Sequence, residues 1–413
     1  MKYIIQLLVI LFSICFSSSL YANCDLTQIT DLERKKEGAV RLLARDNSLN
    51  NFILNKAKEC ESDGIIIKNT FVEDYDYFPF IQKMKQAPAA YTSFISENDS
   101  LGILVYEGLA SALNYYLESN GIEIPEEQQI KIDGKKITAV AFSKDTKHLY
   151  YNNDILNRVG IQIPTTYKEV IAAAEKIRSE GIMEYPLGDL YNNEWELSVQ
   201  FINLYLSLGG VLFKEDSAKP QFRNAEGIAS LEMMKEYSKF INPKLFTGSK
   251  EDIERSWTSG NIAIGNFWGS QYNKLSLTSD TKTSTALYFK KSEAPASTIW
   301  WKGFTIARYL VEPELIASLI TMLHSFNKET IDKNKDDAIW LVKGFEKEEK
   351  ASGLILNQNA KTPSFPISPY ISLLQRSIGN EILDFIINDT KPKKALKKME
   401  KAYKSLAKEL EYL

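Results

Sequence analysis

The stretch GAVRLLARDNSLNNFILNKAKECESDGIIIKNTFV, residues 38–72, changes its pattern twice and indicates the class of the fold. It opens with a short apolar run, continues with apolar residues at helical spacing, and ends in a β-branched segment. Residues 76–86 are again helical in pattern. The segment LGILVYEGLASALNYYLES, residues 101–119, passes from an apolar run, interpreted as a strand, into a helix-like stretch. This alternation predicts an α/β protein whose sheet contains parallel strands.

Polar residues follow two of these apolar runs. Arg45 and Asp46 come directly after the first run, and Tyr106 and Glu107 follow the run that starts at Leu101. Ligands of open α/β sheets bind beyond the carboxyl ends of the strands. We therefore expect these four side chains at a ligand-binding edge.

The rest of the chain is more helical. A capping box of Thr166 and Glu169 predicts a helix through Arg178. At 413 residues the chain exceeds the size at which one core stops growing, which favours two lobes. Further predicted elements are helices at about 194–208, 225–240, 313–326 and 392–413, and strands at 282–291 and 304–308.

The first 22 residues differ from the remainder. Lys2 is their single charge, an apolar core follows, and small residues lead to Ala22. This pattern predicts a secretory signal peptide cleaved after Ala22. A permanent anchor is the weaker alternative, because the apolar run is shorter than the roughly 20 residues that span a bilayer. The residues before Cys24 match a lipid-attachment signal poorly.

Charge and cysteine content restrict the partners. Without Lys2 the mature chain has 49 basic and 53 acidic residues, a net charge of −4, which argues against nucleic acid as a partner. Cys24 and Cys60 remain after cleavage. Export favours a disulfide between them, and two unpaired thiols are the alternative.

Motifs of common enzyme classes are absent from the sequence. Its histidines are His148 and His324, too few for a three-histidine zinc site, and no HExxH or paired CxxC occurs. No GxSxG, GxxxxGKS or GxGxxG motif occurs either. We expect no metal and no cofactor. An exported glycoside hydrolase with two carboxylates stays open as an alternative, with candidates at Glu107, Asp189, Glu194 and Glu196.

Six tryptophans carry the strongest hint of a binding site. An indole offers a flat apolar face to a sugar ring, or to a cation. Trp257 has helical spacing before Gly260 and is expected in the core. The candidates for the site are tryptophans close to turns and strand ends, with two polar neighbours: Trp195, Trp268, Trp300 and Trp301, with Glu194 and Asn266.

An ordered set of segments resembles the extracellular solute-binding proteins of bacterial ABC importers, in the carbohydrate-binding, maltose-binding-protein-like branch. The resemblance covers most of residues 38–413. Its carriers are IDGKKITAVAFSKDTKHLYYNNDILNRVGIQIPTTYKEVIAAAEKI (132–177), YPLGDLYNNEWELSVQFINLYLSLGG (185–210), WTSGNIAIGNFWGSQY (257–272), WWKGFTIAR (300–308) and KKALKKMEKAY (393–403).

The resemblance implies the two-lobed periplasmic-binding-protein fold (type II-like), with the ligand cleft between lobes and several hinge crossings. Lobe one would take 23–144 and 288–328, and lobe two 145–287 and 329–413. It also implies a periplasmic monomer that closes on a sugar or polyol and delivers it to a membrane permease without chemistry. A cationic or amino-acid-like solute is the alternative ligand. The contacts that it implies are Arg45 or Asp46, Tyr106 or Glu107, and the tryptophans at 195, 268, 300 and 301.

Overall fold

The computed structural model describes Cys24 and residues 38–72, 78–191, 193–276, 281–287, 294–325, 331–332, 335–342, 349–388 and 390–413. The predicted signal peptide and part of the predicted strand at 282–291 lie outside these ranges. The strands are β1 (Gly38–Arg45), β2 (Ile65–Val72), β3 (Ser93–Glu97), β4 (Gln129–Ile132), β5 (Lys136–Asn152), β6 (Leu187–Asp189), β7 (Ile264–Trp268), β8 (Thr281–Thr283) and β9 (Ile299–Ile306).

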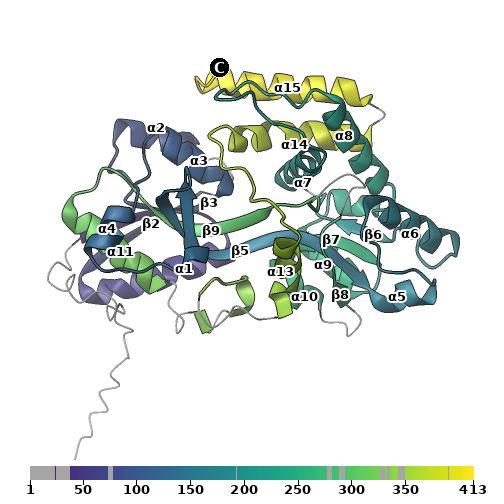
Figure 1. Cartoon of the computed structure of the whole chain (residues 1–413), viewed down its shortest axis with the longest axis horizontal. Coiled ribbons are helices and arrows are strands. Elements are labelled where there is room, and N and C mark those ends of the chain that lie inside the picture. Colours follow the sequence, from purple (N-terminus) through teal and green to yellow (C-terminus); the bar gives the residue numbers. More distant parts are fainter. Residues whose placement is uncertain are drawn as a thin grey trace, which may run out of the picture.

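The α-helices surround this sheet on both sides (Figure 1). They are α1 (Ser48–Lys58), α2 (Phe78–Gln86), α3 (Asn98–Tyr106), α4 (Asn114–Ser119), α5 (Asn153–Arg158), α6 (Tyr167–Ser179), α7 (Glu194–Ser207), α8 (Ala225–Ser238), α9 (Lys250–Thr258), α10 (Tyr272–Leu275), α11 (Glu312–Ser325), α13 (Ser352–Asn359), α14 (Ile371–Ile387) and α15 (Pro392–Glu409).

The strands follow the order β2-β1-β3-β9-β5-β7-β6. β1 pairs in parallel with β2 and β3, as the strand–helix alternation predicted, and β6 pairs in parallel with β7. β9 runs antiparallel to β3 and β5. The fold is therefore a mixed α/β fold with two lobes, each containing parallel strands.

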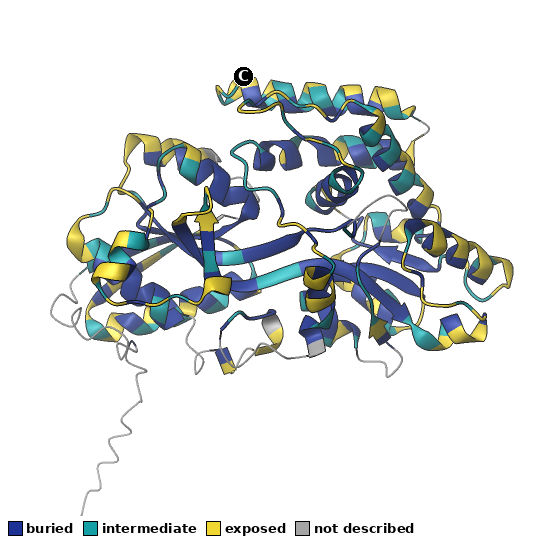
Figure 2. Cartoon of the chain, viewed as in Figure 1, coloured by how far each residue is buried: buried dark blue, intermediate teal, exposed yellow. Residues whose placement is uncertain are grey.

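The long strand β5 belongs to both lobes. Its first part pairs with β9, from Val140 with Phe304 to Thr146 with Ile299, and its second part pairs with β7, from Lys147 to Tyr151. Figure 1 shows β5 and β9 running between the left and right lobes, and Figure 2 shows both strands buried over most of their length. These strands therefore join the two lobes.

Predicted helices are confirmed at both α6 and α15, and α6 also has its predicted cap. Thr166 caps α6 together with Glu169, as the capping box predicted. In α15 the buried positions include Leu396, Met399 and Tyr403, all on one face, and the lysines cover the other. Trp257 ends α9 in the core, where its indole donates to the Leu275 carbonyl at 3.0 Å. These helices could be predicted because a capping box and an apolar face depend on residues only a few positions apart.

The run at 101–105 is a helix, and the prediction of a strand there is wrong. The strand of this region is β3, and α3 begins directly after it, at Asn98. Residues 98–104 are all buried, on every side of α3. A helix that is buried all round has no amphipathic face, so its apolar run at 101–105 cannot be told from a buried strand.

Residues 331–332 and 335–342 do not belong to lobe two, which was expected to resume at 329. Ile331, Ala338, Trp340 and Val342 pack in the apolar cluster that contains β1. The ring of Trp340 lies 6.0 Å from that of Phe52 on α1. This segment therefore contributes to the core of the β1 lobe.

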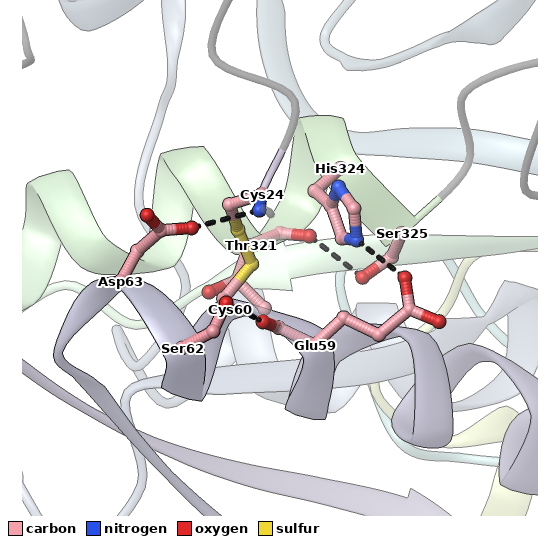
Figure 3. Close-up of a disulfide and its surroundings, with 8 residues drawn as sticks. All are labelled: Cys24, Glu59, Cys60, Ser62, Asp63, Thr321, His324 and Ser325. Atoms are coloured by element: carbon pink, nitrogen blue, oxygen red, sulfur yellow. Dashed lines mark hydrogen bonds and ion pairs between the residues drawn. A yellow bond between two sulfur atoms is a disulfide. The ribbon is translucent and has the colours of Figure 1, made fainter. Parts of the chain in front are cut away.

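Cys24 and Cys60 form a disulfide, with their Cα atoms 4.8 Å apart (Figure 3). The Cys24 N–H donates to the Asp63 carboxylate at 2.8 Å. His324 of α11 lies beside the bond and contacts Glu59 at 3.1 Å. The disulfide thus ties Cys24 to the short turn of helix at Glu59–Asp63.

Candidate ligand-binding site

A cavity of about 370 Å³ is lined by segments of both lobes, a size typical of small-molecule sites. The cavity is lined by residues of the turn after β1, the end of β3, the middle of β5, the first turn of α7, the end of β7 and part of β9. The lining residues are Arg45, Asp46, Asn47, Ser48, Leu49, Glu97, Ser143, Lys144, Asp145, Asn193, Trp195, Glu196, Lys250, Trp268, Ser270, Trp300, Trp301, Lys302, Ala338 and Ile339.

Three tryptophans form one aromatic wall of the cavity. The rings of Trp195 and Trp268 stack with centroids 5.9 Å apart, and Trp300 meets them edge-on at 5.1 and 6.0 Å. Trp300 also packs on Phe365 at 4.0 Å. Each ring is held by others, so this wall is preorganised.

Local structure explains how two of these indoles reach the cavity. Asn193 caps α7 by accepting from the Glu196 N–H at 2.8 Å, which places Trp195 in the first turn. At the end of β7, the Trp268 N–H donates to the Gln271 side chain at 3.1 Å, which closes the turn. The indole N–H of Trp268 donates to Glu196 at 2.8 Å.

The wall on the β1 side is a buried ion network. The Arg45 guanidinium donates to Glu97 at 3.1 Å and to both oxygens of Asp99 at 3.0 Å. Lys302 donates to Glu97 at 2.8 Å. Burial alone would raise the pKa of both carboxyls. At Glu97 the attraction of Lys302 and Arg45 outweighs burial, so the pKa of Glu97 is lowered. At Asp99 burial outweighs the attraction of Arg45, so the pKa of Asp99 is raised. The network fixes the Arg45 side chain at the cavity.

The opposite wall has a second network, around Lys147 of β5. Its ammonium donates to Asp189 at 2.5 Å and to Glu196 at 3.4 Å, and all three side chains are buried. Burial would lower the pKa of Lys147, but the attraction of Asp189 and Glu196 raises it. Burial raises the pKa of Glu196 despite Lys147. Lys147 therefore stays charged and holds two carboxylates together.

In the described part of the chain, the hydrogen-bond donors to the Asp145 carboxylate are neutral. Its Oδ1 accepts the backbone N–H of Thr146 at 2.8 Å and of Ser270 at 3.2 Å. Burial raises the pKa of this carboxyl.

Six of the expected contact residues line this cavity, and four do not. Arg45, Asp46, Trp195, Trp268, Trp300 and Trp301 line it.

Asn266 was expected to face the cleft, but it lies behind the wall. Its amide donates to Asp189 at 2.9 Å and to Gln200 at 3.2 Å. Glu194 is exposed at the start of α7 and is not among the lining residues. Glu196, in the same turn of α7, lines the cavity instead of Glu194.

Tyr106 and Glu107 were expected at the ligand-binding edge because residues 101–105 were predicted to be a strand. These residues belong to α3, and neither Tyr106 nor Glu107 lines the cavity. They lie at the far end of α3, where the Tyr412 hydroxyl donates to Glu107 at 2.6 Å and Lys85 pairs with Glu107 at 2.9 Å. The ring of Tyr106 packs against Tyr370 and Tyr412. The end of the true strand, at Glu97, supplies the contact to the cavity instead.

Sequence reasoning missed Glu97, Asp145, Lys147 and Lys302, and named Glu196 only as a catalytic acid. Glu97 and Lys302 are neighbours across β3 and β9. One signal was available: charged residues inside strands that are otherwise apolar. Burying such a charge is costly unless it is paired, so it indicates a network or a site.

Within the described ranges, Cys24, Cys60 and His324 form the one cluster of potential metal ligands, and its sulfurs are joined in the disulfide. In the same ranges no helix is long and apolar enough to cross a membrane.

The fold and the cavity define a two-lobed ligand-binding protein. The profile of the family described as bacterial extracellular solute-binding protein matches residues 59–301, more than half of the chain, and the chain belongs to this family. No curated relative matches the chain in sequence.

Solved structures share the fold over most of the chain. A solute-binding protein of Agrobacterium radiobacter K84 in complex with ribitol is 16% identical, with a TM-score of 0.72 over 89% of this chain and 98% of that chain. Maltose-bound MalE3 of T. maritima is 17% identical, with a TM-score of 0.68 over 89% and 99%. A solute-binding protein of Agrobacterium vitis S4 with bound D-mannitol is 14% identical, with a TM-score of 0.68 over 91% and 99%.

Proposed function

We propose that this chain is the periplasmic solute-binding component of an ABC importer and that it binds a sugar or sugar-like polyol. The aromatic wall of Trp195, Trp268 and Trp300 carries the proposal. Flat indole faces suit the C–H faces of sugar rings, and the surrounding carboxylates and cations suit their hydroxyls. The ribitol, maltose and mannitol held by similar structures agree with this class.

Ligand binding would draw the lobes together about β5 and β9. A ligand shifts this equilibrium by its higher affinity for the closed form, which the permease then receives. The proposed lobes keep the expected boundaries, except that 331–342 move to lobe one because they pack beside β1. Export through cleavage after Ala22 and a monomeric state belong to the same proposal.

A thermal-shift screen over sugars, polyols, amines and amino acids tests the proposal. Binding to the native state raises the midpoint in proportion to the logarithm of ligand concentration over Kd. We expect a sugar or polyol to raise it and to quench tryptophan fluorescence. Trp268→Phe should reduce the quenching, whereas Trp257→Phe, which changes a core tryptophan, should preserve it. A midpoint that responds only to amino acids would contradict the proposal.

The same samples separate binding from hydrolysis. A glycoside hydrolase would release products from oligosaccharides that it binds, through two carboxylates at the bond. We expect saturable binding of the intact ligand and no product by chromatography. Released product that disappears in Glu196→Gln would favour the hydrolase.

A further inference from the structure

The cations on the β1 side of the cavity are already matched by carboxylates. Arg45 is held by Glu97 and Asp99, and Lys302 by Glu97. Two cations thus meet two carboxylates in one buried network. Asp46 also lines the cavity on this side, but its side chain is exposed and accepts a hydrogen bond from Asn51. The buried part of this wall therefore leaves little charge for a ligand to neutralise.

The opposite wall has more carboxylates than cations. Lys147 is shared by Asp189 at 2.5 Å and Glu196 at 3.4 Å, so the shorter contact goes to Asp189. Glu196 receives its other hydrogen bond from the neutral indole of Trp268. Among the described side chains no ion pair joins Asp145, whose carboxylate accepts from backbone N–H groups. Two carboxylates at the cavity are therefore incompletely neutralised.

Two further lysines border the cavity without correcting this imbalance. Lys144 lines the cavity next to Asp145, and Glu127 is the charge that attracts it. The Lys250 ammonium lies 4.0 Å from Glu254 on a side chain that is 45% exposed. Of the influences on Asp145 and Glu196, that of Lys250 is the smallest.

Asp145 and Glu196 both accept hydrogen bonds from the turn at residues 268–270. Asp145 accepts from the backbone of Ser270, and Glu196 accepts from the indole of Trp268, two residues earlier. The Trp268 ring stacks on Trp195, and the Lys147 ammonium lies 6.0 Å from the centroid of the Trp268 ring. Ion pairing with the carboxylates is therefore the main attraction that this wall offers to the ammonium group of a ligand.

We infer that the ligand carries a protonated amino group, as an amino sugar does, and that Asp145 and Glu196 receive it beside Trp268. The inference rests on the proposed sugar-binding function and narrows its ligand class. Burial raises the pKa of both carboxyls, so their ionised forms gain from a cation. A neutral sugar would bring no charge to this wall.

Matched sugars test the inference by isothermal titration calorimetry at about pH 6, where a sugar amine is protonated. The probes are D-glucosamine, D-galactosamine and chitosan disaccharide. Each is compared with its N-acetylated form and with glucose, galactose or cellobiose. In at least one set we expect the amine to bind about tenfold tighter or more than its N-acetylated form and the neutral sugar. A factor of this size is the effect of one hydrogen bond between charged groups.

Two isosteric variants assign the effect to the carboxylates. Asp145→Asn and Glu196→Gln keep an oxygen for the hydrogen bonds from Ser270 and Trp268, so the turn stays in place. Each should reduce the preference for the amine over its neutral counterpart, measured within the same variant, to about threefold or less. Glu118→Gln removes an exposed carboxylate of α4 and should leave the preference unchanged.

The outcomes separate this inference from the proposed function. Neutral sugars that bind as tightly as their amines overturn the inference and leave the function standing. An amine preference that survives in both variants refutes the roles of Asp145 and Glu196. If no sugar, polyol or amino sugar binds, both the inference and the proposed function fail.

Discussion

Lys147→Met tests whether the buried network behind the cavity depends on its single cation. Lys147 is 1% exposed, and its ammonium is the cation that faces both Asp189 and Glu196. Methionine fills a similar volume but leaves two buried carboxylates without a counter-charge. Removing one partner of a buried ion pair typically costs about 3–5 kcal/mol. We expect a loss of this size in the free energy of unfolding at about pH 7.

Urea unfolding followed by circular dichroism measures this loss. Lys250→Met is the matched control, because its contact with Glu254 is 4.0 Å long and partly exposed. An exposed pair contributes about 1 kcal/mol or less. Lys147→Met combined with Asp189→Asn should recover part of the loss, since one buried charge then disappears. A loss for Lys147→Met no larger than that of the control would show that the buried carboxylates do not depend on Lys147.

The pH dependence of the loss has a defined sign. Burial raises the pKa of Glu196 above its usual value of 4.5 even beside Lys147, and without the lysine it should rise further. The folded variant then binds more protons than the unfolded chain, so its stability falls as the pH rises. We therefore expect a smaller deficit near pH 4.5 than near pH 7. A deficit that is constant or grows toward acid would contradict this explanation.

Three other predictions follow from the structure. Trp268→Ala should weaken the binding of the ligand found in the thermal-shift screen by about tenfold or more while the circular dichroism of the fold is kept; unchanged affinity by calorimetry would exclude Trp268 from the site. Reducing the disulfide, or Cys24→Ser with Cys60→Ser, should cost about 3–4 kcal/mol for a loop of this length, measured by thermal unfolding with and without reductant; equal midpoints would contradict it. Burial lowers the pKa of His148 to about 4 from the usual 6.5, so stability present above pH 6.5 should be lost, by up to roughly 3 kcal/mol, as the pH falls to 4. His148→Phe should flatten that loss in urea midpoints, and an equal loss in both proteins would rule the histidine out.

Elements whose signals are local could be predicted from the sequence. The capping box at Thr166, the amphipathic face of α15 and the strand–helix–strand pattern of residues 38–72 depend on neighbours within a few positions. α3 could not be predicted, because tertiary burial on all sides removes the amphipathic pattern that identifies a helix. That error also moved the expected contact from Glu97 to Tyr106 and Glu107.

The α/β class, the family resemblance and the aromatic character of the site are visible in the sequence, because they depend on local patterns and on residue types such as tryptophans near turns. The charges that meet at the site are known from the tertiary structure. Lys147 contacts Asp189 and Glu196 across 42 and 49 positions, and Arg45 contacts Asp99 across 54. Pairings over such separations depend on how β1, β5 and α7 are brought together. No local pattern encodes that arrangement, and the charge balance of the cavity follows from it.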